Sequence, residues 1–403
     1  MRPLAPAAAA ARSAPRLAPR PATALLPALV LAVAVALSGC QAAAPSTAAE
    51  NSAPTGRTTA APSTATHPAP TAPTAATTST PAADPGTLTM AFAGDVHFED
   101  YLAPLARHPH GLDELQSSLG AADLSMVNLE TAITERGTKI GKEFHFRAPA
   151  SALETIKGAG IDAVSMANNH GVDFGPVGLQ DTLAAKKASP VPIVGIGKDE
   201  DEAFAPAILT AKGLKVAVFG ASEVFEMTLA RYSAGPGKGG IASASPVTRL
   251  REAVSRASAR YDVVVVFLHW GLDYQKCPDQ LSVQTAEALE QAGADIIVGG
   301  HSHRVNGAGW LGRSYVDYGF GNFVWWRSHE PDSRSGVLTL SIDVKAARGT
   351  KRTRTSVVRD AVWTPMLIGA DGIPRPPAAA DSARLLTLWK QAGQCAGLGT
   401  APE

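Results

Sequence analysis

Short apolar segments alternate with amphipathic segments from about residue 87 to residue 301. The apolar segments are LTMAFAGD, DLSMVNLE, IDAVSMANN, VPIVGIG, KVAVFGAS, DVVVVFLHW and DIIVGGHSH. The amphipathic segments between them include GLDELQSSLGAA, SALETIKGAG, GLQDTLAAKKA and DQLSVQTAEALEQAGA. Because the latter carry apolar residues at helical spacing, they predict helices. Continuous apolar strands between helices predict a sheet that is covered on both faces, and therefore an α/β fold.

The pattern changes after residue 303, where RSYVDYGFGNFVW, GVLTLSIDVK and TSVVRDAVWTPML all have strand character. A last helix is expected near SARLLTLWK. In SPVTRLREAVSRASARY we expect Ser245 to cap a helix and Pro246 to occupy its first position. The sequence therefore predicts one domain over residues 87–370, with a β-rich final third. A C-terminal tail over residues 371–403 carries the short helix.

The first 86 residues have a different composition. Every Trp, Tyr and Phe lies at or after Phe92, so this part of the chain cannot build an ordinary core. Residues 40–86 are almost entirely Ala, Pro, Thr and Ser. A segment without large apolar side chains does not offset the entropy lost on ordering. We therefore predict a disordered linker over residues 40–86, which tethers the domain.

The extreme N-terminus is typical of an export signal. Four Arg residues precede the apolar run at residues 22–37, and no acidic residue occurs before Glu50. The run ends in Leu37-Ser38-Gly39-Cys40, which resembles the lipobox of bacterial lipoproteins. The resemblance implies that residues 1–39 are a lipoprotein signal peptide and that a lipid on Cys40 anchors the chain to the extracytoplasmic face of the cell membrane. An ordinary cleaved signal with a nearby Cys, or an uncleaved signal anchor, are the alternatives.

The charge balance limits the partners. The 36 basic and 36 acidic residues give a formal net charge of zero, which argues against nucleic acid as a partner. Removal of residues 1–39 takes away four Arg, so the mature chain has a formal charge of −4 and the lipid has to hold it on the membrane. Three Cys are too few for a disulfide-dense scaffold or a four-Cys zinc site. Cys277 and Cys395 remain, and the sequence leaves open whether they form a disulfide.

Polar residues of metal-binding type follow five of the predicted strands. These strand ends are Gly94-Asp95-Val96-His97, Asn128-Leu129-Glu130, Asn168-Asn169-His170, His269-Trp270-Gly271 and Gly300-His301-Ser302-His303. The carboxyl ends of strands border the ligand crevice in open α/β sheets, so these side chains are expected to converge. They contain five of the ten histidines of the chain.

Each of these residues also has a purely structural explanation. Asp95 is able to cap a helix, His269 to be a hydrogen-bonded core histidine, and Asn168 and Asn169 to form a turn. Five such coincidences together are harder to accept than one metal site. Asp, Glu, Asn and His without Cys suit two divalent ions such as Mn, Fe or Zn. Two ions about 3.5–4 Å apart activate water and hold a phosphate ester. Neither a Walker loop nor a serine nucleophile elbow is visible.

The same segments resemble a known family. AADLSMVNLETAIT, FRAPASALETIKGAGIDAVSMANNHGVDFG, VVFLHWGLDY, AGADIIVGGHSHRV and DYGFGNFVW are similar, in this order, to landmarks of the CapA-type (poly-γ-glutamate) capsule-synthesis family. That family lies within the calcineurin-like metallophosphoesterase superfamily. The resemblance covers about residues 88–326. It implies an α/β, metallophosphoesterase-like β-sandwich flanked by helices, with a metal centre at the strand ends.

The resemblance also implies a role for each matching residue. Asp95, His97 and His303 look like ligands of one ion, and Asn169, His269 and His301 look like ligands of the other. Glu130 falls where the superfamily has a bridging Asp, and it is one methylene longer. His170 resembles the histidine that contacts the phosphate or protonates the leaving group, and Asn168 resembles a supporting residue behind the ligands. His97 completes an Asp-x-His motif where many CapA-type sequences have an apolar residue. Asp273 stands where the family often has Glu, and no role is assigned to it.

Two functions follow as expectations. The first is a lipid-anchored CapA family protein of capsule, poly-γ-glutamate or other cell-surface polymer biosynthesis, with a dinuclear metal-dependent site that hydrolyses phosphate esters. The alternative is a non-catalytic component of an envelope synthase complex that binds or exports an anionic polymer together with membrane subunits. The Gly-rich segment at residues 225–241 is a candidate lid. Its Arg231, Tyr232 and Lys238 either face an anion or belong to a solvated loop.

Overall fold

The computed structural model describes residues 85–349 and 355–403, which lie in one compact unit. The predicted signal peptide and lipidated Cys40 lie outside these residues, as does nearly all of the predicted linker. Within the described ranges, no helix combines the length and the apolar character that a membrane crossing requires.

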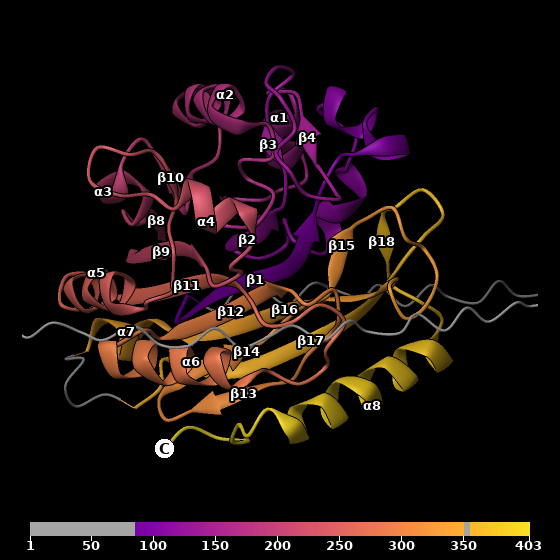
Figure 1. The fold of residues 1–403 in the computed structure, drawn as a ribbon. Helices are drawn as coiled ribbons and strands as arrows, with labels where there is room; N and C mark the ends of the chain where they lie inside the picture. The colour runs from indigo at the N-terminus through magenta and orange to yellow at the C-terminus, as the bar shows by residue number, and fades with distance from the viewer. Residues whose placement is uncertain (1–84, 350–354) are drawn as a thin grey trace, which may run out of the picture. The chain divides into compact units, whose positions relative to one another are not determined.

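Two large β-sheets form the centre of the fold (Figure 1). The first sheet has the strand order β18-β17-β16-β1-β2-β5-β6, and β15 also pairs with β1. Its strands β1, β2, β5 and β6 are parallel, whereas β16, β17 and β18 add antiparallel strands. The strands are β1 Thr87–Val96, β2 Leu124–Leu129, β5 Ala163–Ser165, β6 Ile193–Val194, β15 Asn322–Val324, β16 Arg334–Asp343, β17 Val358–Ile368 and β18 Pro374–Arg375.

The second sheet has the order β13-β14-β12-β11-β9-β8. Strands β9, β11, β12 and β14 are parallel, and β8 and β13 are antiparallel edges. The strands are β8 Ala207–Ala211, β9 Leu214–Ser222, β11 Val263–Trp270, β12 Ile296–His301, β13 Ala308–Leu311 and β14 Ser314–Asp317. Two short pairs lie outside both sheets: β3 Ala132–Ile133 with β4 Arg147–Ala148, and β7 Ile196–Gly197 with β10 Gly240–Ile241.

Three apolar cores show that the sheets face each other and that helices cover their outer faces. Met90 and Phe92 of β1 pack in the same core as Val265 of β11, so this core lies between the sheets. Ala91 and Ala93 point to the opposite side of β1, where α1 and α2 pack. Helices α5 and α6 cover the outer face of the second sheet. The expected sandwich flanked by helices is therefore confirmed. The helices are α1 Ala152–Gly158, α2 Gly175–Ala188, α3 Glu200–Ala203, α4 Met227–Tyr232, α5 Thr248–Ser258, α6 Gln280–Ala292, α7 Val344–Arg348 and α8 Ala379–Cys395.

Two local predictions are wrong. The segment GLDELQSSLGAA forms only a 3-10 helix at Asp113–Ser117, because Gly111 and Gly120 flank it and Leu112 at its start supplies no side-chain cap. Helix α5 begins at Thr248, and its N-cap residue, Val247, makes no side-chain hydrogen bond. Ser245 and Pro246 both lie before this N-cap position, so Ser245 does not cap the helix and Pro246 is not its first residue. The backbone of Ser245 is bound instead by the Ser243 hydroxyl, which donates to the Ser245 carbonyl at 2.8 Å and accepts from the Ser245 N–H.

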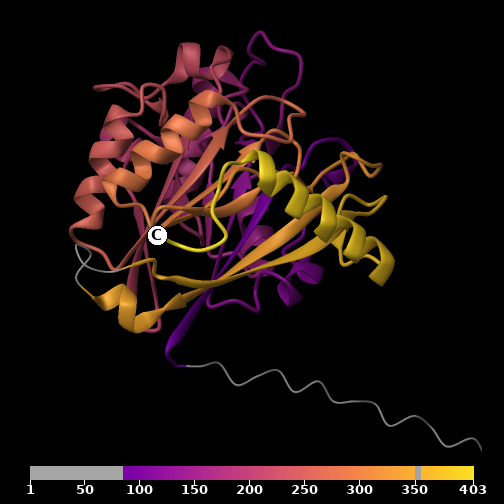
Figure 2. The same cartoon turned by 90° about the horizontal axis from the view of Figure 1, so that it is seen from below.

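Helix α8 closes the C-terminal side of the fold. It packs against β17 and β13, and Figure 2 shows the yellow helix crossing the orange and yellow strands. Trp389 of α8 stacks on Trp363 of β17 with ring centroids 5.6 Å apart. A disulfide joins Cys395, at the end of α8, to Cys277 in the loop after β11. The pairing that the sequence left open is thus present, and it ties the C-terminus to a loop beside the strand ends.

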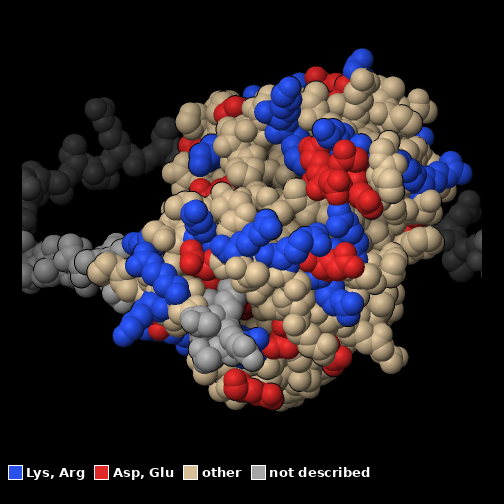
Figure 3. All heavy atoms as spheres, turned by 90° about the vertical axis from the view of Figure 1, so that its left-hand side faces the viewer, with Lys and Arg blue, Asp and Glu red and all other residues tan. Residues whose placement is uncertain are grey.

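The face of the molecule that carries α5 has a mixture of charges. In Figure 3, basic side chains form a band across this face, and acidic side chains lie among them. Arg249 of α5 pairs with Asp201 at 2.5 Å, and Arg256 lies 4.0 Å from Glu252 on the same helix. These pairs reduce the positive potential around α5.

Candidate metal centre

The carboxyl ends of parallel strands from both sheets meet at one edge of the sandwich. From the first sheet, β1 carries Asp95 and leads into His97, and Glu130 directly follows β2. In the second sheet, His269 lies near the end of β11, and His301 ends β12. All of these side chains are buried.

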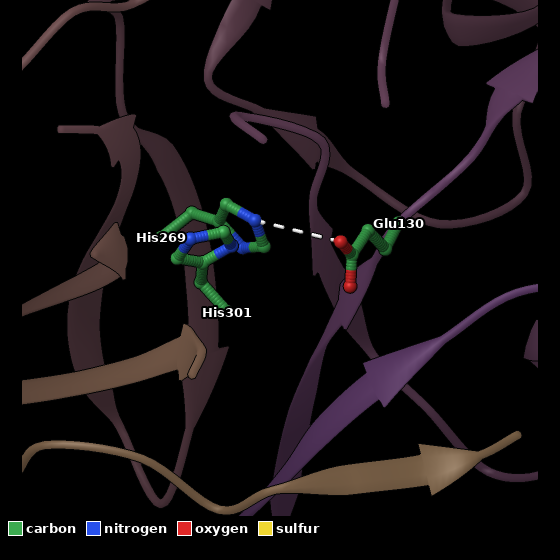
Figure 4. Close-up of side chains that lie close together, drawn as sticks. All are labelled: Glu130, His269 and His301. Carbon is green, nitrogen blue, oxygen red and sulfur yellow. Dashed lines mark ion pairs between the residues drawn. The ribbon is translucent and has the colours of Figure 1, made fainter. Parts of the chain in front are cut away.

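Glu130 is shared by two groups of side chains whose ligand atoms lie within 4.8 Å of one another. One group is Glu130, His269 and His301, and the other is Asp95, Glu130 and His303. Figure 4 shows His269 and His301 opposite the Glu130 carboxylate, and His269 Nε2 lies 3.5 Å from Glu130 Oε1. The longer side chain of Glu130 thus still reaches both groups from the end of β2.

The groups have the electrostatics of a cation site. Glu130 is fully buried, and neither of its carboxylate oxygens has a hydrogen-bond partner among the described residues. Burial raises the pKa of Glu130 well above its usual value, and the charge of Asp95 raises it further. Burial also lowers the pKa of His269, and that of His301 to about 3. Neutral imidazoles beside an uncompensated buried carboxylate fit a divalent cation, which offsets the desolvation of the carboxylate.

Unusual backbone angles and a close approach between Gly300 and Asp95 occur at the same strand ends. His301 has φ 93° and His303 has φ 52°, which is a backbone region that non-glycine residues rarely adopt. Such strain is typical of functional sites. Gly300 provides the space beside His301, because a Cβ at this position would lie 2.2 Å from Asp95 Oδ1. The backbone N–H of His301 in turn donates to Asp95 Oδ2 at 3.1 Å.

Asn169 lies beside the first group. Its Oδ1 is 2.9 Å from His269 Nε2, and its Nδ2 donates to Glu226 Oε2 at 3.2 Å. The Glu226 carboxylate therefore orients the amide so that its oxygen faces the histidines. The Asn169 carbonyl accepts 2.5 Å hydrogen bonds from Lys142 Nζ and from the Thr228 hydroxyl, which fix the backbone.

Asn168 and Asn128 form a layer behind the ligands. Asn168 Nδ2 donates to Asn128 Oδ1 at 3.0 Å, and Asn128 Nδ2 donates to Asp95 Oδ1 at 2.8 Å. Asn168 Oδ1 accepts from the backbone N–H of His170 at 3.1 Å. This chain of hydrogen bonds links β1, β2 and the loop after β5, and the supporting role of Asn168 behind metal ligands stays a prediction.

His97 belongs to neither group. Its ring stacks on Phe146 at 4.4 Å, and Trp325 contacts it edge-on at 4.2 Å. Nδ1 of His97 accepts a hydrogen bond from the Glu99 N–H at 3.1 Å, whereas Nε2 is buried without a partner. Coordination through Nε2 would require the ring proton to move to Nδ1, which would remove the bond from Glu99. The ligand role of His97 stays a prediction.

His170 is held by two charged residues that the sequence did not single out. His170 Nδ1 lies 2.6 Å from Asp173 Oδ2 and 3.1 Å from Lys142 Nζ, and Lys142 is 2.7 Å from Asp173 Oδ1. Burial raises the pKa of Asp173 to about 6, an effect that Lys142 opposes, and burial lowers the pKa of His170. Nδ1 donates to Asp173, so Nε2, 3.8 Å from Glu130 Oε1, is the nitrogen that faces the centre.

A cavity of about 430 Å³ opens beside these residues. Asn169, His170 and His303 line it together with aromatic side chains of three loops. Glu226 and Met227, at the start of the predicted lid, also line it, whereas Arg231, Tyr232 and Lys238 do not. Asp273, which received no role, lines the cavity and places Oδ1 3.5 Å from His301 Nε2.

Most of the described part of the chain is similar in sequence to known bacterial proteins. Residues 89–325 match the family model of the bacterial capsule synthesis protein PGA_cap. The capsule biosynthesis protein CapA of Bacillus anthracis is 27% identical over 245 residues, which are 59% of this chain and 59% of that protein. The PGA biosynthesis protein CapA of Bacillus subtilis (strain 168) is 28% identical over 244 residues, 59% of this chain and 63% of that protein. The matched region thus spans about three fifths of these relatives.

Solved structures give weaker similarities. A hypothetical protein from Thermus thermophilus aligns with a TM-score of 0.40 and 15% identity, covering 69% of this chain and 98% of that chain. The 5'-nucleotidase from Candida albicans SC5314 aligns with a TM-score of 0.39 and 10% identity, covering 76% of this chain and 58% of that chain.

Proposed function

This chain belongs to the bacterial capsule synthesis family, and on that premise we propose that it hydrolyses a phosphate ester with two divalent metal ions during the biosynthesis of a cell-surface polymer. The observation that carries the proposal is the position of Glu130. It is buried without a hydrogen-bond partner among the described residues and is shared by two groups of potential ligands. A carboxylate in this position suits a bridge between two cations.

The residues present fit the ions. Asp95, Glu130 and His303 would hold one ion, and Glu130, His269 and His301, assisted by Asn169, would hold the other. Oxygen and imidazole ligands without sulfur favour Mn, Fe or Zn. Bound ions would supply Lewis-acid stabilisation of the phosphate oxygens and a water molecule of lowered pKa.

The remaining chemistry belongs to side chains around the centre. Asp173 keeps the proton of His170 on Nδ1, so that Nε2 presents a lone pair toward the centre. From this position Nε2 is suited to accept a hydrogen bond from the nucleophile or to carry a proton to the leaving oxygen. Phe146 stacks on the His170 ring at 3.9 Å and holds its plane. Glu226 keeps the Asn169 amide oxygen directed at the histidines.

We extend the proposal to the location of the protein. The basic, apolar and Leu-Ser-Gly-Cys segments at residues 1–40 support export and lipid anchoring on the outer face of the cell membrane. The domain would then act on polymer precursors or products outside the cytoplasm, beside membrane synthase subunits. The names of the Bacillus relatives support a link to capsule or PGA biosynthesis.

The test is elemental analysis of the purified full chain together with hydrolysis of a generic aryl phosphodiester, with and without Mn²⁺. We expect two ions per chain and turnover that falls by at least about a hundredfold in His301→Ala. His108→Ala is the matched control, because His108 is exposed and lies outside the centre. A chain that retains no ion after growth with ample metal, and that shows no turnover, would refute the proposal in favour of a polymer-binding role.

A further inference from the structure

The mouth of the cavity has an unusual balance of charges. Among the described residues that line it, the carboxylates are Glu143, Glu226, Asp273 and Asp332, and the cations are Lys142 and Arg327. A site that recognised a polyanion would be expected to present free cations to its ligand. Whether the two cations are free therefore decides what the mouth attracts.

Both cations are already engaged by the protein. Lys142 Nζ contacts Asp173 Oδ1 at 2.7 Å and the Asn169 carbonyl at 2.5 Å, and its side chain is only 10% exposed. Arg327 pairs with Asp332 at 3.2 Å. Asp332 is bound in addition by Arg304 at 2.7 Å, so these two guanidinium groups and one carboxylate keep a single positive charge, which is fewer than the three carboxylates that remain.

Three carboxylates then remain at the mouth: Glu143, Glu226 and Asp273. Each of them is exposed. One carboxylate oxygen of Glu226 accepts a hydrogen bond from the Asn169 amide, and Asp273 Oδ1 lies 3.5 Å from His301 Nε2. Neither contact carries a full compensating charge, so the mouth has a negative potential that begins next to the metal centre.

Aromatic rings border the same opening. Phe144 is 44% exposed, and its ring meets that of Trp326 edge-to-face with centroids 6.4 Å apart. Both residues line the cavity. The faces of Trp and Phe rings attract ammonium groups, and the attraction grows when the cation is partly desolvated. Aromatic rings beside carboxylates are therefore the surroundings that an ammonium group prefers.

We propose that the substrate is zwitterionic: a phosphate ester that also carries an ammonium group, with the phosphate at the metal centre and the ammonium group between Glu143, Phe144 and Trp326. The position of the phosphate in this inference rests on the proposed function. The position of the ammonium group is argued from the residues at the mouth. It also means that a polyanionic chain would be repelled by three carboxylates as it approached the centre. The cavity thus takes an amine-bearing precursor or chain end rather than the interior of an anionic polymer.

The test measures binding separately from hydrolysis. Calorimetry on the metal-loaded full chain would compare three phosphonates of similar size: 2-aminoethylphosphonate, 2-hydroxyethylphosphonate and 3-phosphonopropionate. We expect the ammonium compound to bind at least about threefold more tightly than the neutral one and about tenfold more tightly than the carboxylate. The preference should shrink as ionic strength rises.

A pair of charge-reversal variants locates the effect. Glu143→Lys should remove most of the preference for the ammonium compound, whereas Glu154→Lys should leave it unchanged. Glu154 is also exposed, but it lies on α1 and does not line the cavity. Equal binding of the three compounds, tighter binding of the carboxylate, or equal effects of the two variants would overturn the inference. Failure of the proposed function would look different, because the preference in binding would persist while the corresponding phosphate esters were not hydrolysed.

Discussion

Replacing Glu130 with Gln should have opposite effects on stability in the metal-free and the metal-loaded protein. Without metal, the variant removes a buried carboxylate that has no hydrogen-bond partner among the described residues. With metal, it removes the charge that both groups of ligands share. The expected sign of the change in Tm therefore depends on whether the ions are bound.

The size of the metal-free effect follows from the pKa of Glu130. Its folded value is raised above the unfolded value of 4.5, so the native state holds more protons than the unfolded state above pH 4.5. Stability then falls as pH rises from 4.5 toward the folded pKa, and the Gln variant escapes this loss. At pH 8 the loss is at most about 5 kcal/mol, since one pH unit is worth about 1.4 kcal/mol. We expect about 1–3 kcal/mol, the usual cost of a buried polar group that has no hydrogen-bond partner.

The assay is thermal unfolding at pH 5 and pH 8, with chelator and with Mn²⁺. In chelator at pH 8, Glu130→Gln should raise Tm by about 2–4 °C for each kcal/mol gained, and at pH 5 the gain should nearly vanish. Adding metal at a hundred times its dissociation constant should stabilise the parent chain by about 2.7 kcal/mol for each ion bound and leave the variant almost unchanged.

Glu223→Gln is the matched control. Glu223 is also buried and has an unpartnered Oε1, and burial raises its pKa to about 7, yet it belongs to neither ligand group. Its replacement should raise Tm at pH 8 by the same amount with and without metal. A Glu130→Gln variant that lost stability in chelator, or that gained as much from Mn²⁺ as the parent chain does, would refute the reasoning.

Four further outcomes are expected. His170→Ala should abolish hydrolysis of the aryl phosphodiester while elemental analysis still finds the parent's metal content, because the side chain lies beside the ligand groups and not in them; a loss of metal would speak against this role. Gly300→Ala should lower metal affinity by at least about tenfold in calorimetry, since its Cβ would meet Asp95 Oδ1. Asp317→Asn should flatten the fall in stability between pH 5 and pH 8 seen in urea unfolding, because burial raises the pKa of Asp317 to about 8 and the native state keeps its proton over that range. Cys395→Ser should lower stability by at most about 5 kcal/mol, since the disulfide closes a loop of 118 residues.

The convergence of the strand ends was predictable because it depends on local pattern alone. An apolar run that stops at a polar residue marks the carboxyl end of a strand, and parallel strands bring such ends to one edge. This is why Asp95, Glu130, His269 and His301 lie together although more than two hundred residues separate the first from the last. The β-rich C-terminal part of the fold could be predicted from the sequence for the same reason, because its strands also follow a local apolar pattern.

Other parts depend on contacts that no local pattern encodes. Lys142 and Glu226 stand in irregular segments, so nothing in their neighbourhood indicates that they bind Asn169 from two sides. Asp173 has only its spacing of three from His170 as a signal. The disulfide between Cys277 and Cys395 requires α8 to cross β17, which is a matter of tertiary packing.

The number of ligands in each group bears on whether the centre is structural or catalytic. Structural zinc sites use four protein ligands, whereas catalytic sites use three and leave a position for water or substrate. Each group here contains three titratable residues, and His97, which stacks on Phe146, lies outside both groups. An open position on that ion would face the same cavity as His170, since His303 lines its wall. A group of three protein ligands thus favours a reactive centre over a closed structural one.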